Sequence, residues 1–223
     1  KSMVQIIVLA AVAFFLFWRL RSVLGSRQGF EKVNKNVDEK TKSSKTNTNS
    51  GDKIIDLKSS IVDEDIADYV DESSEQFKIL SELKKLEDGW LVSDFVSGAK
   101  LAYEEILMAF ENGDLNKIKK LSSKEVFTAF KDVIDDRNQK GFQVEADFGG
   151  VRDIRIKDVK LNKKNLEANI TMIFQCDITY SIKDKNNKIV EGGSDKVKKQ
   201  KDIWTFTRKM NSDVPIWYLT KTE

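Results

Sequence analysis

The pattern of apolar and polar positions divides the chain into segments with different periodicities. Residues 3–18 are uncharged and, except for Gln5, apolar; apolar residues then recur at three- and four-residue intervals from 54 to about 140 and alternate with polar residues from 143 onward. The first pattern is typical of a membrane span, the second of amphipathic helices and the third of strands. We therefore expect one transmembrane helix followed by an α+β domain, with its helices before an antiparallel sheet.

The N-terminal run MVQIIVLAAVAFFLFW carries no charge. Extended to Leu20, this run gives about 17 residues or roughly 25 Å of helix, which is near the lower limit for a membrane span. Arg19 and Arg21 can extend their stems along the acyl region and place their guanidinium groups at the membrane surface. We predict a transmembrane anchor over residues 1–24. A cleaved signal peptide is the alternative, but WRLRSVLGSR lacks a small-x-small cleavage pattern.

Basic residues also predict the orientation of this anchor. Only Lys1 precedes the apolar run, whereas five basic residues follow it closely: Arg19, Arg21, Arg27, Lys32 and Lys35. Because positive charge concentrates on the cytoplasmic side of a span, we expect the C-terminal part in the cytoplasm. The single cysteine fits a reducing compartment.

Two segments separate the anchor from the domain. Residues 25–53 are rich in Asn, Lys, Ser and Thr, and we predict a disordered tether because they have too little apolar surface to offset the entropy of ordering. A coil of that length reaches on the order of 25 Å or more. Residues 54–91 show two amphipathic helical patterns. We expect these to pack on the domain; docking on a membrane or a partner is the alternative.

Residues 92–223 are predicted to form the folded domain. A long helix is expected to start with Asp94 as its cap and to end at Gly113, and a later helix to start with a Ser122–Glu125 capping box and end at Gly141. Alternating segments then predict strands at 143–148, 152–161, 166–182, 188 onward, 202–209 and 216–221. The consecutive glycines at 149 and 150 predict a bulge that curls the sheet. A curled sheet closed by a helix makes a cone with a pocket.

The composition argues against several classes of partner and of catalytic or metal site. The 38 basic and 36 acidic residues nearly cancel, which argues against a nucleic-acid partner. No histidine and only Cys176 are present, which removes disulfides, Cys/His zinc sites and histidine-based triads. GGSDKVKK lacks the spacing of a phosphate-binding loop. We predict no enzymatic activity, no metal site and no cofactor, with Cys176 as a buried core thiol.

Two groups of residues are candidates for binding. The first would line the pocket: Phe95, Ala99, Tyr103, Phe142, Phe174 and Trp204, together with Tyr180 and Phe206. Plain core packing is the alternative for each, and Tyr103 is favoured because a buried hydroxyl needs a partner. The second would contact anionic headgroups together with Arg19 and Arg21: Lys196, Lys198 and Lys199. A solvated sheet edge protected by lysines is the alternative for this second group.

Several short motifs resemble those of one known family. They are QIIVLAAVAFFLFWRLRSVLGSRQGFEK, FVSGAKLAYEEILMAFENGDL, the helix ending in DDRNQKG, and WTFTRKMNSDVPIWYLTKTE. In order and spacing they resemble the family of the mitochondrial inner-membrane translocase subunit forty-four and its alphaproteobacterial homologues. The likeness covers about residues 95–222 and adds an anchor like that of the bacterial members.

The resemblance implies a cone-shaped α+β fold like that of nuclear transport factor two, with a large apolar pocket. It also implies a non-enzymatic scaffold role, which in the mitochondrial member gathers the import motor and its DnaK-type chaperone. This chain has a predicted span and tether in place of that member's long N-terminal region. Import-motor function therefore does not transfer, and we expect a single-pass protein of a bacterial inner membrane.

Three functions follow. The first, which we favour, is a membrane-tethered adaptor that binds client or chaperone proteins near the inner membrane, in protein translocation or membrane-protein biogenesis. The second is a carrier or sensor of a lipid or other apolar ligand in the cone. The third is an enzyme on this fold, which the missing histidine disfavours and which loss of an activity on mutating Asp147 or Asp177 would revive.

Overall fold

The computed structural model describes residues 63–223. The predicted anchor at 1–24, with Arg19 and Arg21, the tether at 25–53 and residues 54–62 lie outside the described residues. Within 63–223, no helix has the length and apolar character needed to cross a membrane.

Helices occupy the first half of the described chain. They are α2 (Glu64–Ala67), α3 (Glu75–Leu86), α4 (Val92–Asn112), α5 (Leu115–Leu121) and α6 (Lys124–Lys140). Gly113 and Gly141 end α4 and α6 in the left-handed conformation, as predicted.

Two predicted helix starts were wrong. Ser123 rather than Ser122 caps α6, where its hydroxyl accepts from the N–H of Val126. Helix α4 begins two residues before Asp94, and its N-cap residue Leu91 makes no side-chain cap. The start of α4 was misplaced because Asp65, far away in the sequence, caps this helix; the residues next to α4 do not reveal that cap.

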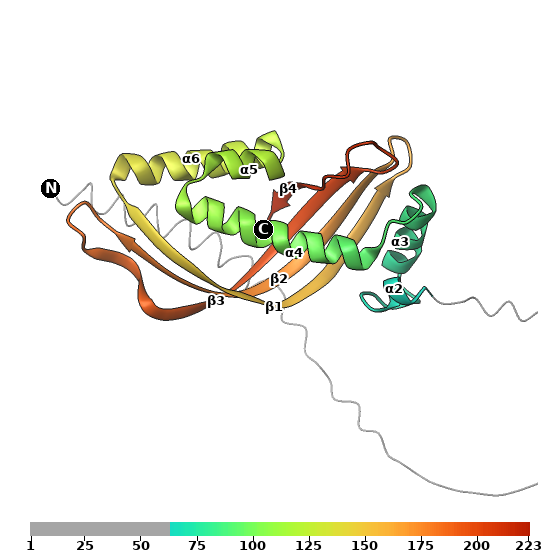
Figure 1. The fold of residues 1–223 in the computed structure, drawn as a ribbon, viewed down its shortest axis with the longest axis horizontal. Helices are drawn as coiled ribbons and strands as arrows, with labels where there is room; N and C mark the ends of the chain where they lie inside the picture. Colours follow the sequence, from blue (N-terminus) through green and yellow to red (C-terminus); the bar gives the residue numbers. More distant parts are fainter. Residues whose placement is uncertain (1–62) are drawn as a thin grey trace, which may run out of the picture. The chain divides into compact units, whose positions relative to one another are not determined.

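The second half is an antiparallel meander with the strand order β1-β2-β3-β4 (Figure 1). The strands are β1 (Gln143–Asn162), β2 (Glu167–Lys183), β3 (Ile189–Lys209) and β4 (Tyr218–Thr222). The predicted strands 143–148 and 152–161 are one long strand. Helices followed by a curved antiparallel sheet confirm the predicted α+β class.

Irregularities in β1 bend the sheet. Its pairing with β2 shifts between Phe148 and Gly150, where a bulge was predicted, and shifts again at two later points. A Cβ at Gly149 would lie 3.1 Å from the carbonyl oxygen of Asp177, and Gly150 has φ +112°. A larger residue is thus disfavoured by close approach at Gly149 and by backbone conformation at Gly150.

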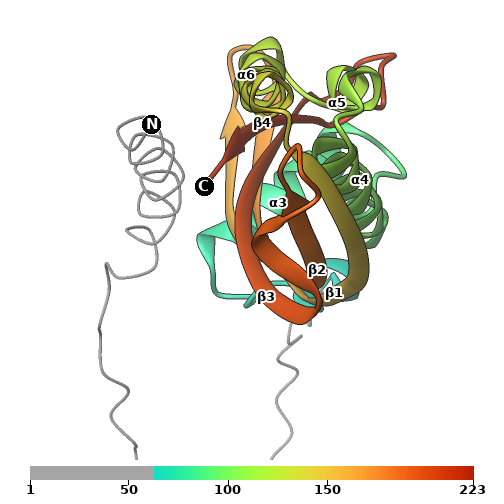
Figure 2. The ribbon, with the colours of Figure 1, turned by 90° about the vertical axis from the view of Figure 1, so that its left-hand side faces the viewer.

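Helix α4 packs across the concave face of this bent sheet (Figures 1 and 2). The alternation of β2 places its even-numbered side chains against the helix. Those from 168 to 178 are all buried: Ala168, Ile170, Met172, Phe174, Cys176 and Ile178. From α4 the core receives Phe95, Ala99, Tyr103 and Ile106. Helices α2 and α3 lie at one end of α4, and α5 and α6 lie at the other (Figure 1).

Candidate functional site

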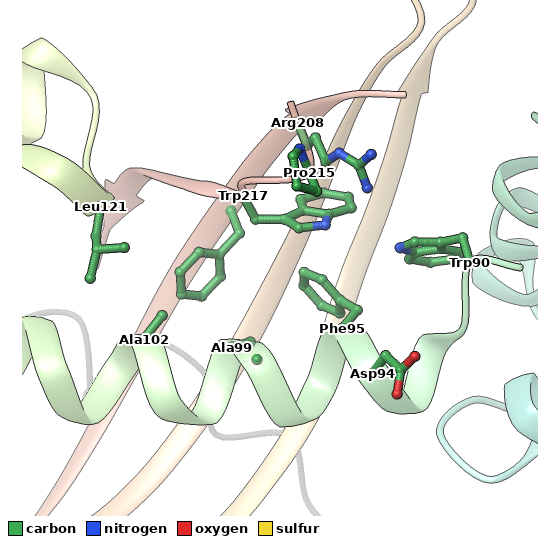
Figure 3. Close-up of a pocket in the computed structure, with 11 residues that line it drawn as sticks. Trp90, Asp94, Phe95, Ala99, Ala102, Leu121, Arg208, Pro215 and Trp217 are labelled. Carbon is green, nitrogen blue, oxygen red and sulfur yellow. The ribbon is translucent and has the colours of Figure 1, made fainter. Parts of the chain in front are cut away.

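A half-open groove of about 340 Å³ lies between the first half of α4 and the segment that leads into β4 (Figure 3). The helix, the end of β3 and the segment before β4 supply most of its walls. The lining residues are Trp90, Asp94, Phe95, Gly98, Ala99, Ala102, Leu121, Phe206, Arg208, Pro215 and Trp217.

Aromatic rings form the inner part of the groove. The rings of Phe95 and Trp217 meet edge to face with centroids 4.7 Å apart, and Trp90 lies 6.3 Å from Trp217. Phe206 on β3 meets Phe95 edge to face at 6.4 Å. These separations lie in the range of favourable aromatic pairs, so the rings form a packed apolar surface.

On the α4 side of the groove, Gly98 contributes no side chain. This glycine is exposed, and a Cβ built on it would meet no atom within 4 Å. Asp94, one turn earlier, is an exposed carboxylate at the mouth (Figure 3). The groove therefore has aromatic rings on the inside, the Asp94 carboxylate at its mouth, and open space next to Gly98.

An ion pair stabilises the side of the groove opposite α4. The guanidinium Nη2 of Arg208 lies 2.8 Å and 2.9 Å from the two carboxylate oxygens of Glu87, and its Nε donates to the carbonyl of Val214 at 3.2 Å. The backbone N–H of Asn211 donates to the same carboxylate. Only 6% of the Arg208 side chain is exposed. This pair joins the end of α3 to the segment that carries Pro215 and Trp217, so it fixes the groove's width.

The start of α4 is capped from α2. The carboxylate of Asp65 accepts hydrogen bonds from the backbone N–H groups of Val92 at 2.8 Å and Ser93 at 3.0 Å, and it pairs with Lys84. Burial opposes ionisation of Asp65, but the hydrogen bonds from Ser93, Val92 and Lys84 outweigh it and lower its pKa to about 2. A carboxylate at this position interacts favourably with the positive end of the helix dipole. The cap also fixes the first residue of α4, which forms one side of the groove.

The structure divides the predicted pocket residues. Phe95, Ala99 and Phe206 line the groove, whereas Tyr180 is half-buried on β2 and does not. Tyr103, Phe174 and Trp204 lie in the closed core instead, where the rings of Tyr103 and Phe174 stack at 4.2 Å. Phe142 is half-buried between α6 and β1 and is not among the lining residues.

Tyr103 has the partner that its burial requires. Its hydroxyl donates to the carboxylate of Asp202 at 2.7 Å and lies 3.1 Å from the sulfur of Cys176. Burial, and after it the charge of Asp202, raises the pKa of Tyr103 far above its ordinary value. The phenol therefore stays protonated and ties α4 to β3 through the core. Cys176 is buried, as predicted.

The predicted basic run is split between the two faces of β3. Lys196 and Lys199 are exposed, whereas the ammonium of Lys198 lies 4.8 Å from the centre of the Tyr180 ring. Alternation along the strand puts Lys198 and Lys199 on opposite faces. The three lysines do not form one flat basic surface.

Sequence reasoning missed most of the groove. Trp90, Arg208 and Trp217 were not proposed for it, because three different elements bring them together. One signal was available: in TFTRKM, Arg208 occupies a core-facing position of an alternating strand, and a buried charge needs a fixed partner.

The groove can bind apolar groups but offers little chemistry. Its ionisable lining residues are Asp94 and Arg208, and the guanidinium of Arg208 is held by Glu87. Over residues 63–223, no group of three or more His, Cys, Asp or Glu side chains is placed to hold a metal ion.

Comparison with known proteins gives one family. A search among curated proteins found no match. Among solved structures, the intermembrane-space region of the chloroplast protein ARC6 is similar with a TM-score of 0.40 and 9% identity, covering 57% of this chain and 94% of that one. The model of the Tim44-like domain matches residues 77–223, well over half of the chain, in agreement with the motifs quoted above. The chain belongs to the Tim44-like domain family.

Proposed function

We propose that this protein is a non-enzymatic adaptor, tethered to a bacterial inner membrane, whose groove holds an apolar segment of a partner protein. The Tim44-like family is one of membrane-associated, non-catalytic scaffolds related to protein translocation. The predicted anchor and tether would hold the domain near the membrane while leaving it free to reach partners.

The observation that carries this proposal is the aromatic lining of the groove, with exposed apolar residues next to the lining residues in the sequence. Exposed apolar side chains flank the lining residues in sequence: Leu91, Val214, Ile216 and Tyr218. Exposed apolar groups next to buried aromatic rings are typical of protein interfaces, where such rings act as anchors for a partner. A groove that is open along its side accepts a continuous chain segment more readily than a closed cavity does.

A carrier of a lipid or other apolar ligand is the second candidate. The apolar lining favours it. The volume, about 340 Å³, lies at the low end of the range of roughly 300–1,000 Å³ for small-molecule sites. Such a carrier would retain its ligand without the anchor, whereas the adaptor needs the membrane to meet its partners.

In-cell cross-linking separates the two candidates. The full-length protein is compared with a variant that lacks residues 1–51, and captured proteins and lipids are identified by mass spectrometry. We expect specific protein adducts with the tethered form only. Lipid adducts without protein adducts, retained by the truncated variant, would overturn the adaptor proposal in favour of the carrier.

A further inference from the structure

Strand β3 has a long edge that β4 leaves uncovered. Strand β4 pairs with β3 only at Trp204–Thr207, and Glu223 adds one reciprocal pair of backbone hydrogen bonds with Ile203 (Figure 1). Toward its N-terminus, β3 continues as far as Ile189. Between 197 and 202, β3 therefore has β2 on one side and no strand of the described chain on the other.

The bonds at Ile203 determine which backbone groups face this edge. Ile203 both donates to and accepts from Glu223, so its N–H and C=O point away from β2. Pairing with β2 is regular from Val197 to Ile203, without a bulge. Because direction alternates along a strand, the N–H and C=O groups of Val197, Lys199 and Lys201 also point outward. Within residues 63–223, no backbone hydrogen bond joins these outward groups to another strand or loop.

The exposed side chains between 197 and 202 are basic or apolar, whereas Gln200 is half-buried and Asp202 is buried. Lys196, Lys199 and Lys201 are exposed, and none of the three forms an ion pair with another described residue. Val197 is 64% exposed. Across the sheet, the nearest carboxylate on the register of Lys199 is that of Asp177, which already pairs with Arg152. The edge thus combines open hydrogen-bonding groups with lysines that form no ion pair within the described residues.

We propose that this edge binds an acidic, extended segment of a partner protein, which adds a strand to the sheet in line with β4. Main-chain hydrogen bonds to Val197, Lys199 and Lys201 would provide affinity, as in other strand additions. Residues directly opposite Lys199 and Lys201 would lie on the same face as these lysines, so carboxylates two positions apart in the partner complement them.

Two other occupants fit less well. A second copy of this chain, paired edge to edge, would place lysines beside lysines, which is unfavourable. An anionic bilayer would be met by lysines that alternate between two faces, and it would leave the outward backbone groups without strand partners. The acidic segment satisfies both the charges and the hydrogen bonds.

Residue-resolved amide exchange of the full-length protein in mild detergent tests the proposal. The probes are the alternating peptide Glu-Val-Glu-Val-Glu-Val, its Lys-for-Glu counterpart, and vesicles containing phosphatidylserine. In the free protein the amides of Lys199 and Lys201 should exchange much faster than those of Lys198 and Gln200, which face β2. The acidic peptide should slow the first pair by roughly tenfold or more and leave the second pair unchanged, since only strand addition covers the outward groups.

Substitutions at the edge supply matched controls. Lys199→Pro removes one outward N–H without removing a bond to β2, and it should abolish peptide binding while the fold persists. Charge reversal by Lys199→Glu with Lys201→Glu should weaken binding roughly tenfold and favour the basic peptide. Lys100→Glu, on the exposed face of α4 and away from both the groove and the β3 edge, should leave peptide binding unchanged.

Three results would overturn the proposal. One is equal binding of the acidic and basic peptides. Another is protection by vesicles but by neither peptide, which would indicate a membrane-contact surface. The third is protection of the outward amides in the free protein that is lost on dilution, which would indicate self-association.

Discussion

At the scale of single residues, a few polar side chains fix the geometry of the groove. Asp65 caps α4, and Arg208 with Glu87 holds the segment that carries Trp217. Each makes several contacts in a partly buried setting, where a missing partner costs more than on the surface. These residues should therefore control stability and groove shape together.

The Asp65 cap predicts a pH dependence. Its pKa falls from an ordinary 3.8 to about 2 in the folded protein, so its stabilising effect is full above about pH 4 and is lost as the pH falls toward 2. Asp65→Ala should lower the free energy of unfolding by about 0.5–2 kcal/mol at pH 7. It should also flatten the profile between pH 4 and 2, measured by denaturant titration.

The exposed Asp68 on the same turn provides the control, because Asp68→Ala removes a carboxylate without removing a cap. Equal acid sensitivity of the wild type and Asp65→Ala would show that the cap does not carry the effect.

The Arg208–Glu87 pair predicts non-additive losses. Arg208→Met leaves the Glu87 carboxylate without its guanidinium partner and should lower the free energy of unfolding by roughly 1–3 kcal/mol. Adding Glu87→Gln should cost less than the sum of the single losses, because the uncompensated charge is then absent. A double-mutant cycle followed by urea unfolding measures the coupling; additive losses would mean that the pair makes no specific contribution.

At the scale of elements, the sequence predicted whether a segment is a helix or a strand better than it predicted the residue at which a helix begins. The helical period before residue 140 and the alternation after 143 correspond to α4, α6 and the sheet, because each pattern reflects one buried face. The start of α4 was misplaced because its cap, Asp65, lies 27 residues before Val92. Of the groove, Phe95 and Ala99 were predicted because they lie on the apolar face of one helix, and Phe206 because it alternates with polar residues along one strand. Trp90 and Trp217 meet only through the tertiary fold.

Two glycines in regular elements predict opposite effects of a methyl group. Gly98 lies inside α4 with open space around it, so Gly98→Ala should raise the free energy of unfolding by roughly 0.5–1 kcal/mol. At Gly192 a Cβ would lie 2.0 Å from the carbonyl oxygen of Tyr180, at φ +78°. Gly192→Ala should therefore destabilise by more than about 1 kcal/mol.

Thermal unfolding checks both substitutions. Each kcal/mol corresponds to a shift of roughly 2–4 °C in Tm for a chain of this size. A rise for Gly192→Ala, or a fall for Gly98→Ala, would contradict the local geometry described for these positions.

At the scale of the whole molecule, the groove and the β3 edge are separate surfaces on one domain. The groove is apolar and lies at α4, whereas the edge is basic and lies along β3. A scaffold that carries two chemically different surfaces can hold two partners at once. With the predicted anchor and tether, both would act close to the membrane.

Partner capture at the groove is the central claim, and site-specific photo-cross-linking in cells tests it most directly. A photoreactive residue replaces Asp94 at the groove mouth or, as a control, the exposed Lys100 outside the groove. We predict protein adducts at position 94 that Gly98→Leu abolishes by filling the groove, and none of the same adducts at position 100. Adducts at 94 that are only lipid, or protein adducts that survive Gly98→Leu, would contradict the account.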